Sequence, residues 1–375
     1  MSWETRSLID IANVSTGKWN ANHAEKKGKY RFYTCASKHL FSNTKRFSGE
    51  CLILPGNGAN VGDVYYYEGE FDAYQRTYVI SDIKIFPRFL KYHMLLNWRA
   101  KNEKKQYGSA TNYIKIGNFE EYLVSYPSLQ VQKQIVEKLD AAFADIDKAI
   151  SATEKNIENA EALFDKSVSK IFVENAFEYE TKRLSDISEY FNGLTYSPKD
   201  VSPEGVIVLR SSNIQNNKMD YKDLVRVKKN IKDKLYVLDS DILICSRNGS
   251  KRLIGKSSII GKYHEKMTFG TFMMIVRSEY NEYLKWFFIS SLFKKQISKG
   301  ENNMINQITR YMLDEVIVPF PEDSEKKQIS LNLNSIYEGT SKLIDTYRKK
   351  LQHLDSLKTS ILNQAFSGEF TKDAA

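Results

Sequence analysis

The sequence predicts an α+β fold in which two similar globular domains with twisted sheets are separated by two long antiparallel helices that form a coiled coil. Three observations predict this fold. The chain repeats itself with an internal pseudo-twofold relationship, each repeat begins with short β-rich segments, and each repeat ends in a helical stretch far longer than an ordinary core helix. At 375 residues, the chain is long enough for several domains with cores of their own.

The repeat is visible in two separate alignments. Trp3 to Gly17 (WETRSLIDIANVSTG) matches Tyr179 to Gly193 (YETKRLSDISEYFNG) at an offset of 176 residues. Gly108 to Ile135 matches Asn302 to Ile329 at an offset of 194 residues. The difference of 18 residues (194 − 176) means that the second globular half carries extra length between its two matching segments. Matching segments that flank different sequences predict one scaffold that presents two different surfaces.

Each repeat is expected to begin with four short strands, because β-branched and aromatic residues gather between turn residues. A helix is expected to follow, around residues 89–100 and 283–295. A short strand that ends in an aromatic–proline pair then closes each globular part. The strands are expected within residues 29–35, 51–57, 63–69 and 76–83 of the first repeat, and within 206–212, 242–248, 257–263 and 271–278 of the second.

The last part of each repeat is about 40 residues long and contains no proline, and its only glycine is Gly339. Apolar residues recur there at spacings of three, four and seven, which is typical of amphipathic helices that pair in a coiled coil. At 1.5 Å per residue each helix is roughly 60 Å long, so we expect spacers; the alternative is two helices inside one compact core. The residues expected in the coiled coil are Ile135, Leu139, Ile146, Ile150, Ile157, Ile329, Leu333, Leu343, Leu351 and Leu354.

These patterns divide the chain into five segments. They are a first globular domain (1–127), a first spacer helix (128–173), a second globular domain (174–321), a second spacer helix (322–366) and a C-terminal tail (367–375).

The charge of the chain is concentrated in the globular domains. The net charge is +9 and 13% of the residues are aromatic, a balance that suits a polyanionic partner. Residues 129–172 hold six Lys/Arg and eight Asp/Glu, and residues 323–366 hold seven and five, so the helices together sum to zero. The basic surplus therefore lies outside them.

The expected loops of both globular domains contain residues suited to double-stranded DNA. Lysine and arginine neutralise phosphates, whereas Asn, Gln, Arg and Ser can read base edges through paired donors and acceptors. The candidates in the first domain are Lys18, Asn20, Asn22, Lys26, Lys27, Lys29, Arg31, Lys104, Lys105 and Asn112. Those in the second are Arg210, Ser212, Asn213, Gln215, Lys218, Arg247, Asn248, Lys251, Arg252, Asn306, Gln307 and Arg310.

No motif predicts catalysis, a metal site or a membrane segment. The three cysteines and five histidines lack metal-ligand spacing, and no serine–histidine–aspartate or methyltransferase motif occurs. The start lacks the features of a signal peptide, and no apolar run is long enough to cross a bilayer. We therefore expect a cytoplasmic protein that binds no cofactor and is not an enzyme.

Two glycine-rich stretches approach nucleotide-binding motifs but fail on spacing. In GNGANVG (56–62), Val61 stands where a dinucleotide fingerprint needs its third glycine. In GSKRLIGKS (249–257), five residues separate the glycines where a phosphate-binding loop requires four. Both are expected to be turns followed by strands, with glycines that supply positive φ.

Taken in order, these features resemble the specificity subunit of a type I restriction–modification system across essentially the whole chain. The resemblance rests on the duplicated Glu-Thr start, on DSDILICSRNGSKRLIGK (239–256), and on Asn-x-Ile before each aromatic–proline pair. It also rests on the Lys-Gln-Ile helix entries and on SILNQAFSGEF (360–370). Ser240 departs from it, because glycine is more usual before the aspartate, and TCASK (34–38) lacks the arginine that corresponds to Arg210.

The resemblance implies that each globular domain binds one half of a bipartite, asymmetric DNA site. The helices would fix the spacer between the halves and dock modification subunits, which methylate adenine with S-adenosylmethionine. Restriction subunits would supply cleavage driven by ATP and Mg. Two alternatives remain open at this point: an enzyme that modifies nucleic acid, and an interaction scaffold that acts through its coiled coil.

Overall fold

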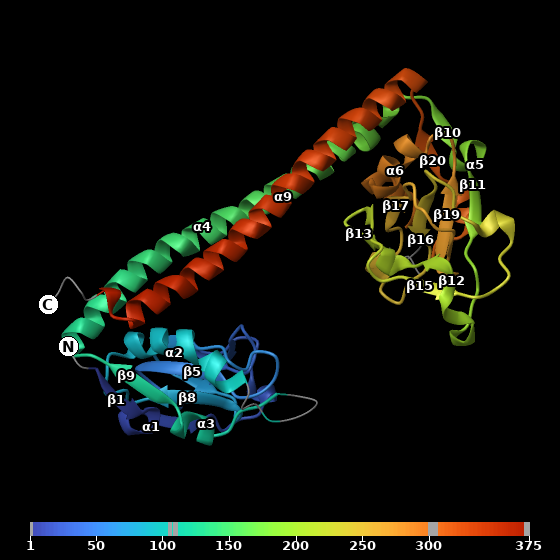
Figure 1. The fold of residues 1–375 in the computed structure, drawn as a ribbon. Coiled ribbons are helices and arrows are strands. Elements are labelled where there is room, and N and C mark those ends of the chain that lie inside the picture. The colour runs from blue at the N-terminus through green and yellow to red at the C-terminus, as the bar shows by residue number, and fades with distance from the viewer. Residues whose placement is uncertain (1–2, 104–106, 108–111, 299–306, 371–375) are drawn as a thin grey trace. The chain divides into compact units, whose positions relative to one another are not determined.

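The computed structural model describes residues 3–103, 107, 112–298 and 307–370, and the chain divides into two compact units. Unit 1 comprises Met1–Glu154 and Arg348–Ala375, and unit 2 comprises Lys155–Tyr347. Each unit therefore holds one globular domain and one end of each long helix (Figure 1). In the described part of the chain, no helix combines the length and the apolar composition needed to cross a bilayer.

The globular domain of unit 1 is built on two sheets. Its strands are β1 (Glu4–Ser7), β2 (Asn13–Thr16), β3 (Tyr30–Tyr33), β4 (Leu40–Ser42), β5 (Glu50–Pro55), β6 (Tyr65–Glu68), β7 (Phe71–Ala73), β8 (Thr77–Ser81) and β9 (Leu123–Tyr126). An antiparallel sheet has the order β2-β8-β5-β6. A second sheet has the order β4-β3-β7, in which β3 and β7 run parallel. Strand β1 pairs with β9, which closes the domain.

Helix α2 (Pro87–Asn102) covers one face of the larger sheet of unit 1 and contacts β5 and β6 (Figure 1). Proline at its first turn suits a helix start, because the missing N–H would have no partner there. Its buried face includes Phe89, Leu90, Met94 and Trp98, at the three- and four-residue spacing of an amphipathic helix. The short helices α1 (Leu8–Ile11) and α3 (Gly117–Glu120) contact each other.

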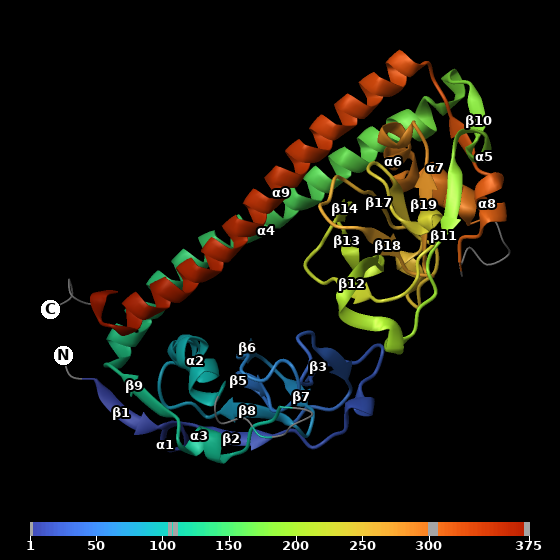
Figure 2. The ribbon, with the colours of Figure 1, turned by 45° about the vertical axis from the view of Figure 1, so that its right-hand side comes forward.

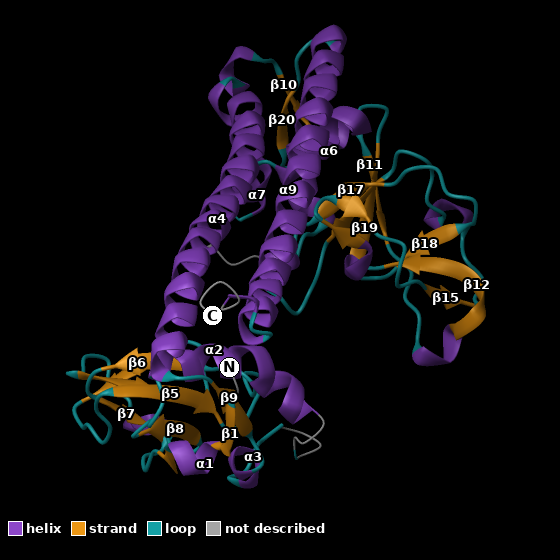
Figure 3. Ribbon diagram, turned by 60° about the vertical axis from the view of Figure 1, so that its left-hand side comes forward, coloured by secondary structure: helices purple, strands orange, loops and turns teal. Residues whose placement is uncertain are grey.

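The globular domain of unit 2 repeats this plan. Its strands are β10 (Thr181–Arg183), β11 (Glu189–Asn192), β12 (Val201–Leu209), β13 (Ile214–Gln215), β14 (Lys218–Met219), β15 (Val225–Val227), β16 (Ile242–Cys245), β17 (Ser257–Ile259), β18 (Met267–Phe269), β19 (Met273–Arg277) and β20 (Ile317–Pro319). The sheets have the orders β11-β19-β16-β17 and β15-β12-β18, and β12 and β18 run parallel. Figure 3 shows β12, β15 and β18 next to one another in the smaller sheet. Strand β10 pairs with β20, as β1 pairs with β9.

The expected internal repeat is therefore confirmed in the sheet topology. The hairpin β13–β14 is an addition in unit 2 and lies within the extra length expected there. The single helix expected over 283–295 is instead two helices, α6 (Asn281–Ile289) and α7 (Ser291–Ile297). The chain turns at Ser290, because its side chain caps α7 by accepting a hydrogen bond from the Phe293 amide at 3.2 Å.

Two glycines that recur at the 176-residue offset are required by close packing. A Cβ atom on Gly17 would lie 1.7 Å from the Ala73 carbonyl oxygen, and one on Gly193 would lie 2.0 Å from the Gly270 carbonyl oxygen. Ser240, the residue that departs from the family resemblance, adopts a φ of 67°, a conformation that favours glycine.

The long helices are α4 (Leu129–Ser169) and α9 (Asp323–Phe366), and they lie side by side and antiparallel in both units (Figure 2). In unit 1, Lys358 pairs with Asp147 at 2.5 Å. In unit 2, the rings of Phe164 and Tyr337 lie 5.1 Å apart. The expected coiled coil is thus present.

Burial along the helices agrees with most of the expected contact residues. Five are buried (Ile135, Leu139, Ile146, Ile329 and Leu333), and four are partly buried (Ile150, Ile157, Leu351 and Leu354). Leu343 does not fit the expected pattern, because 42% of it is exposed. Thr340, Ile344 and Tyr347 occupy the inward positions at spacings of four and three, which turns Leu343 about 100° away from the partner helix.

The ends of the long helices complete the globular cores in the same way in both units. In unit 1, Phe366 near the end of α9 packs on Phe89, with ring centroids 5.2 Å apart. In unit 2, Phe172 after α4 packs on Tyr283 at 5.4 Å. The two pairs are related by the 194-residue offset of the repeat, so each globular domain uses the end of a helix for the same purpose.

Candidate nucleic-acid interface

The loops at one end of the larger sheet in unit 1 are joined by backbone hydrogen bonds. The Gly56 amide donates to the Arg76 carbonyl at 2.9 Å, and the Ile114 amide donates to the Gly56 carbonyl at 3.0 Å. The Gln75 amide donates to the Trp19 carbonyl at 2.9 Å. These bonds join segments that are far apart in sequence into one surface, which we call the loop edge of unit 1: residues 17–20, 56–62, 74–76 and 112–115.

Unit 2 has an equivalent loop edge, formed by residues 193–196, 246–253, 270–272 and 307–310. The Ile308 amide donates to the Ser246 carbonyl at 2.7 Å, and the Arg247 amide donates to the Phe272 carbonyl at 3.1 Å. Ile308 corresponds to Ile114 at the 194-residue offset, so the same backbone contact follows the central strand in both units.

Charge separates the loop edge from the opposite end of the sheet in both units. The loop edge of unit 1 holds three basic residues and no acidic one, and that of unit 2 holds four and none. At the opposite end, residues 48–50, 68–70 and 81–84 of unit 1 hold four acidic residues and one basic residue. The opposite end in unit 2 holds five acidic residues and one basic residue, in segments 186–189, 238–241 and 277–279. A polyanion is therefore attracted to the same end of each domain.

The structure brings only some of the unit 1 candidates together. Lys18, Asn20 and Asn112 lie on the loop edge, and Asn22 follows in the short helix at 21–23. The segment with Lys26, Lys27 and Lys29 is not on the loop edge. It lies beside residues 41–43, where the Glu25 amide donates a hydrogen bond to the Phe41 carbonyl. Arg31 lies within β3 and stacks over Tyr67 at 4.5 Å. Lys104 and Lys105 lie outside the described residues.

The unit 2 candidates are more closely grouped. Six lie on the loop edge: Arg247, Asn248, Lys251, Arg252, Gln307 and Arg310. The turn after β12, with Arg210 and Ser212, adjoins them, since Asn248 Nδ2 donates to Ser211 Oγ at 3.1 Å. Gln215 and Lys218 lie on the β13–β14 hairpin, where the Lys218 ammonium lies 4.8 Å from the Tyr337 ring centroid. Asn306 lies outside the described residues.

Asn213 differs from what the sequence led us to expect. It is fully buried, and its Nδ2 donates to the carbonyls of Asp220 and Asp223 at 3.0 and 2.9 Å. Its Oδ1 accepts from the Arg210 amide at 2.9 Å. With both ends of the amide bound to backbone, Asn213 holds the turn together and has no free group to offer to a base.

Sequence reasoning missed exposed residues in the turns between strands. Gln75 and Arg76 occupy the β7–β8 turn of unit 1, and Phe272 occupies the β18–β19 turn of unit 2 with 53% of it exposed. The Arg247 guanidinium lies 5.6 Å from the Phe272 ring centroid. The available signal was a polar or aromatic pair between two strand-like segments, although only the fold shows that these turns join the loop edge.

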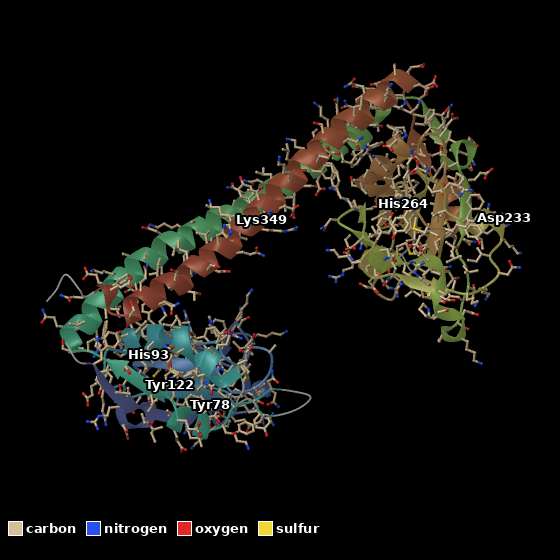
Figure 4. All side chains as sticks on the ribbon, in the orientation of Figure 1. Tyr78, His93, Tyr122, Asp233, His264 and Lys349 are labelled. Atoms are coloured by element: carbon tan, nitrogen blue, oxygen red, sulfur yellow. The ribbon has the colours of Figure 1, made fainter. Side chains whose placement is uncertain are left out.

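Each loop edge adjoins a hollow. In unit 1, a hollow of about 360 Å³ is lined by Thr16, Gly56, Asn57, Gln75, Arg76, Tyr78, Tyr113 and Ile114. Figure 4 labels Tyr78 in this unit. Burial raises its pKa, and its hydroxyl donates to the Ile114 carbonyl at 3.4 Å, so it stays a neutral phenol. In unit 2, four basic side chains line a hollow of about 560 Å³: Lys166, Arg252, Lys256 and Lys294. Burial lowers the pKa of Lys256.

The two glycine-rich stretches form turns, as their spacing predicts. Gly58, Gly62 and Gly255 have positive φ as expected, whereas Gly56 and Gly249 do not, and strands β6 and β17 follow the stretches in place of a helix. Burial raises the pKa of Cys51 to about 11, and it also raises that of Cys245, so both remain unreactive thiols. Within the described residues, no group of three His, Cys, Asp or Glu side chains is placed to hold a metal ion.

The duplicated α+β domains, the paired helices and the basic loop edges are features of a protein suited to bind a polyanion such as DNA. Residues 1–159 and 177–353 match the type I restriction modification DNA specificity domain, and the chain belongs to this family. It is a specificity subunit of a type I restriction–modification system, with a role in DNA sequence recognition.

Two relatives by sequence agree with this assignment, and two solved structures share the fold. The type I restriction enzyme EcoDI specificity subunit of Escherichia coli is 26% identical, over 99% of this chain and 89% of that protein. The EcoKI specificity subunit of Escherichia coli strain K12 is 28% identical, over 50% of this chain and 42% of that protein. A chain from a study of assembly and conformational transition in the type I R-M system has a TM-score of 0.75 at 14% identity, over 97% of both chains. The HsdS subunit from Thermoanaerobacter tengcongensis has a TM-score of 0.51 at 14% identity, over 98% of this chain and 97% of that one.

Proposed function

We propose that each globular domain reads one half of a bipartite, asymmetric DNA site through its loop edge. One observation carries the proposal: the same end of the sheet is basic in both units, while the opposite end is acidic. The loop edges have similar frames but different side chains, for example Gln75 and Arg76 in one turn and Phe272 in the other. Unlike surfaces read unlike sequences, which makes the site asymmetric.

We further propose that α4 and α9 set the spacer between the half-sites and dock modification subunits. Half-sites on one face of B-DNA lie about 34 Å apart, and continuous helices of 41 and 44 residues are long enough to connect two readers at that separation. Exposed leucines on the helices, such as Leu163, Leu331 and Leu357, suit contact with another protein.

The chemistry belongs to the partners in this proposal. Modification subunits methylate adenine with S-adenosylmethionine, and restriction subunits cleave DNA with ATP and Mg, in the cytoplasm. The chain itself contributes recognition only. Neither of the other two readings, a nucleic-acid-modifying enzyme or a coiled-coil scaffold, is favoured by the family or by the loop edges.

A domain exchange tests the proposal. Residues 1–127 are replaced by the corresponding domain of another specificity subunit, and the chimera is produced with its modification subunits. Sequencing of modified bases in the host genome should show a motif in which one half has changed and the other half is retained. The parental chain is the control, and a chimera with the unfolding temperature of the parent but a motif altered in both halves would contradict independent reading.

A further inference from the structure

Arg76 differs from the other arginines of unit 1. The side chains of Arg6, Arg88 and Arg99 pair with carboxylates, and those of Arg31 and Arg46 lie over aromatic rings. Arg348 also has a partner. Among the described arginines of unit 1, Arg76 alone has a guanidinium with neither a polar nor an aromatic partner, and it is exposed. Five N–H donors are therefore free at this position.

The backbone beneath Arg76 is held from three sides. The Arg76 carbonyl accepts hydrogen bonds from the Gly56 amide at 2.9 Å and from Cys35 Sγ at 3.3 Å. The preceding Gln75 amide donates to the Trp19 carbonyl at 2.9 Å, and the Thr77 amide closes the turn on the Tyr74 carbonyl at 2.8 Å. Because this backbone is already fixed, a ligand that binds Arg76 has to order its side chain but not the turn that carries it.

The described residues that line the hollow beside Arg76 include no carboxylate that could compete for it. The hollow of about 360 Å³ beside it is lined by Asn57, Gln75 and Thr16, together with tyrosines and backbone, and contains no acidic residue. Gln75 is already oriented, since its Nε2 donates to Asn20 Oδ1 at 2.8 Å. An incoming ligand with two adjacent acceptors would be the first strong partner of the guanidinium.

Guanine presents two such acceptors, O6 and N7, on the major-groove edge of its base pair, and a guanidinium bonds to both at once. We propose that Arg76 reads a guanine in the half-site recognised by unit 1. This inference rests on the proposed function and adds a residue and a base to it. The corresponding turn in unit 2 carries Thr271 and Phe272, which cannot make this contact, so the other half-site is read differently.

The test compares Arg76→Ala with Arg46→Ala, each produced with its modification subunits in cells whose modified bases are sequenced. Arg46 is an exposed arginine of the same unit, near the opposite end of the sheet, so both variants lose one positive charge. With Arg76→Ala, one guanine in one half of the motif should become degenerate, and discrimination there should fall on the order of ten- to a hundred-fold. Arg46→Ala should leave the motif unchanged.

A second variant distinguishes the loss of a base contact from a general loss of DNA binding. Arg76→Gln should shift the same position toward adenine, because a glutamine amide pairs with adenine N6 and N7. The proposal is overturned if Arg76→Ala leaves the motif intact, relaxes a position other than guanine, or abolishes modification altogether at an unchanged unfolding temperature. A parental motif that is not bipartite would overturn the proposed function itself, whatever the variants do.

Discussion

At the scale of single residues, polar side chains in this protein divide between holding the fold and facing solvent on the loop edges. Asn213 and Asn248 are both asparagines in turns after strands, yet Asn213 is fully buried and Asn248 is only partly buried. Their sequence contexts are alike, so composition and turn preference could not separate them. Burial decides the role, because a buried amide must satisfy its hydrogen bonds within the protein.

His93 links the stability of unit 1 to pH. It is buried, and Nδ1 lies 3.0 Å from the Tyr122 hydroxyl. Figure 4 labels both residues. Burial, with a smaller contribution from Lys101, lowers its pKa to about 4, from 6.5 in the unfolded chain. Below pH 6.5 the unfolded state takes up a proton that the folded state does not, so stability is lost as pH falls toward 4. At pH 5 the loss is roughly 2 kcal/mol.

Hydrogen exchange of unit 1 peptides at pH 7.5 and pH 5, corrected for the intrinsic exchange rate, measures this effect. His93→Phe is the matched variant, because Phe287 occupies the corresponding position of unit 2. The variant should lose the part of the pH dependence that His93 contributes. An equal loss of stability at pH 5 in both proteins would show that other groups are responsible.

At the scale of elements, the sequence was most informative where a pattern is local. The long helices, the main strands and the duplication all follow from periodicity and from direct comparison of the two halves. The break between α6 and α7 at Ser290 and the exposure of Leu343 do not, because each depends on tertiary contacts or on small rotations along a helix. The β1–β9 pairing joins residues more than 110 positions apart, which local patterns do not encode.

The end of each long helix should stabilise one globular domain selectively. Phe366→Ala removes a ring that packs on Phe89 and His93, with centroids 5.2 and 5.5 Å away, and should destabilise unit 1 by roughly 2 kcal/mol because the ring is only partly buried. Phe172→Ala, at a fully buried position, should destabilise unit 2 by about 3–5 kcal/mol.

Hydrogen exchange resolved by peptide distinguishes the two units in these variants. Although Phe366 lies near the C-terminal end of the described residues, its loss should increase exchange in the N-terminal globular domain, residues 3–103. Increased exchange in unit 2 with Phe366→Ala, or an unchanged unit 1, would be inconsistent with the packing described.

At the scale of the whole molecule, the class of protein was predictable from sequence, but the surface proposed to read DNA was not. Charge counting located the basic surplus in the globular domains and therefore favoured DNA as the partner. Charge counting could not show that Lys18 lies near Arg76 on the loop edge while Lys26, Lys27 and Lys29 lie away from it beside β4. That separation in space depends on how the strands pair. The polarity of the domains emerges only when distant loops are joined.

DNA binding by two double variants, measured as a function of salt with the modification subunits present, tests the central claim that the loop edge faces the duplex. Lys18→Ala with Lys115→Ala removes two charges from the loop edge of unit 1, and Arg46→Ala with Lys84→Ala removes two from outside it. The loop-edge variant should bind all duplexes more weakly, and its slope of log K against log salt should be shallower by about 1.8, from 0.9 per phosphate contact. The control variant should keep the parental slope. Equal slopes in both variants, or a shallower slope in the control alone, would contradict the account.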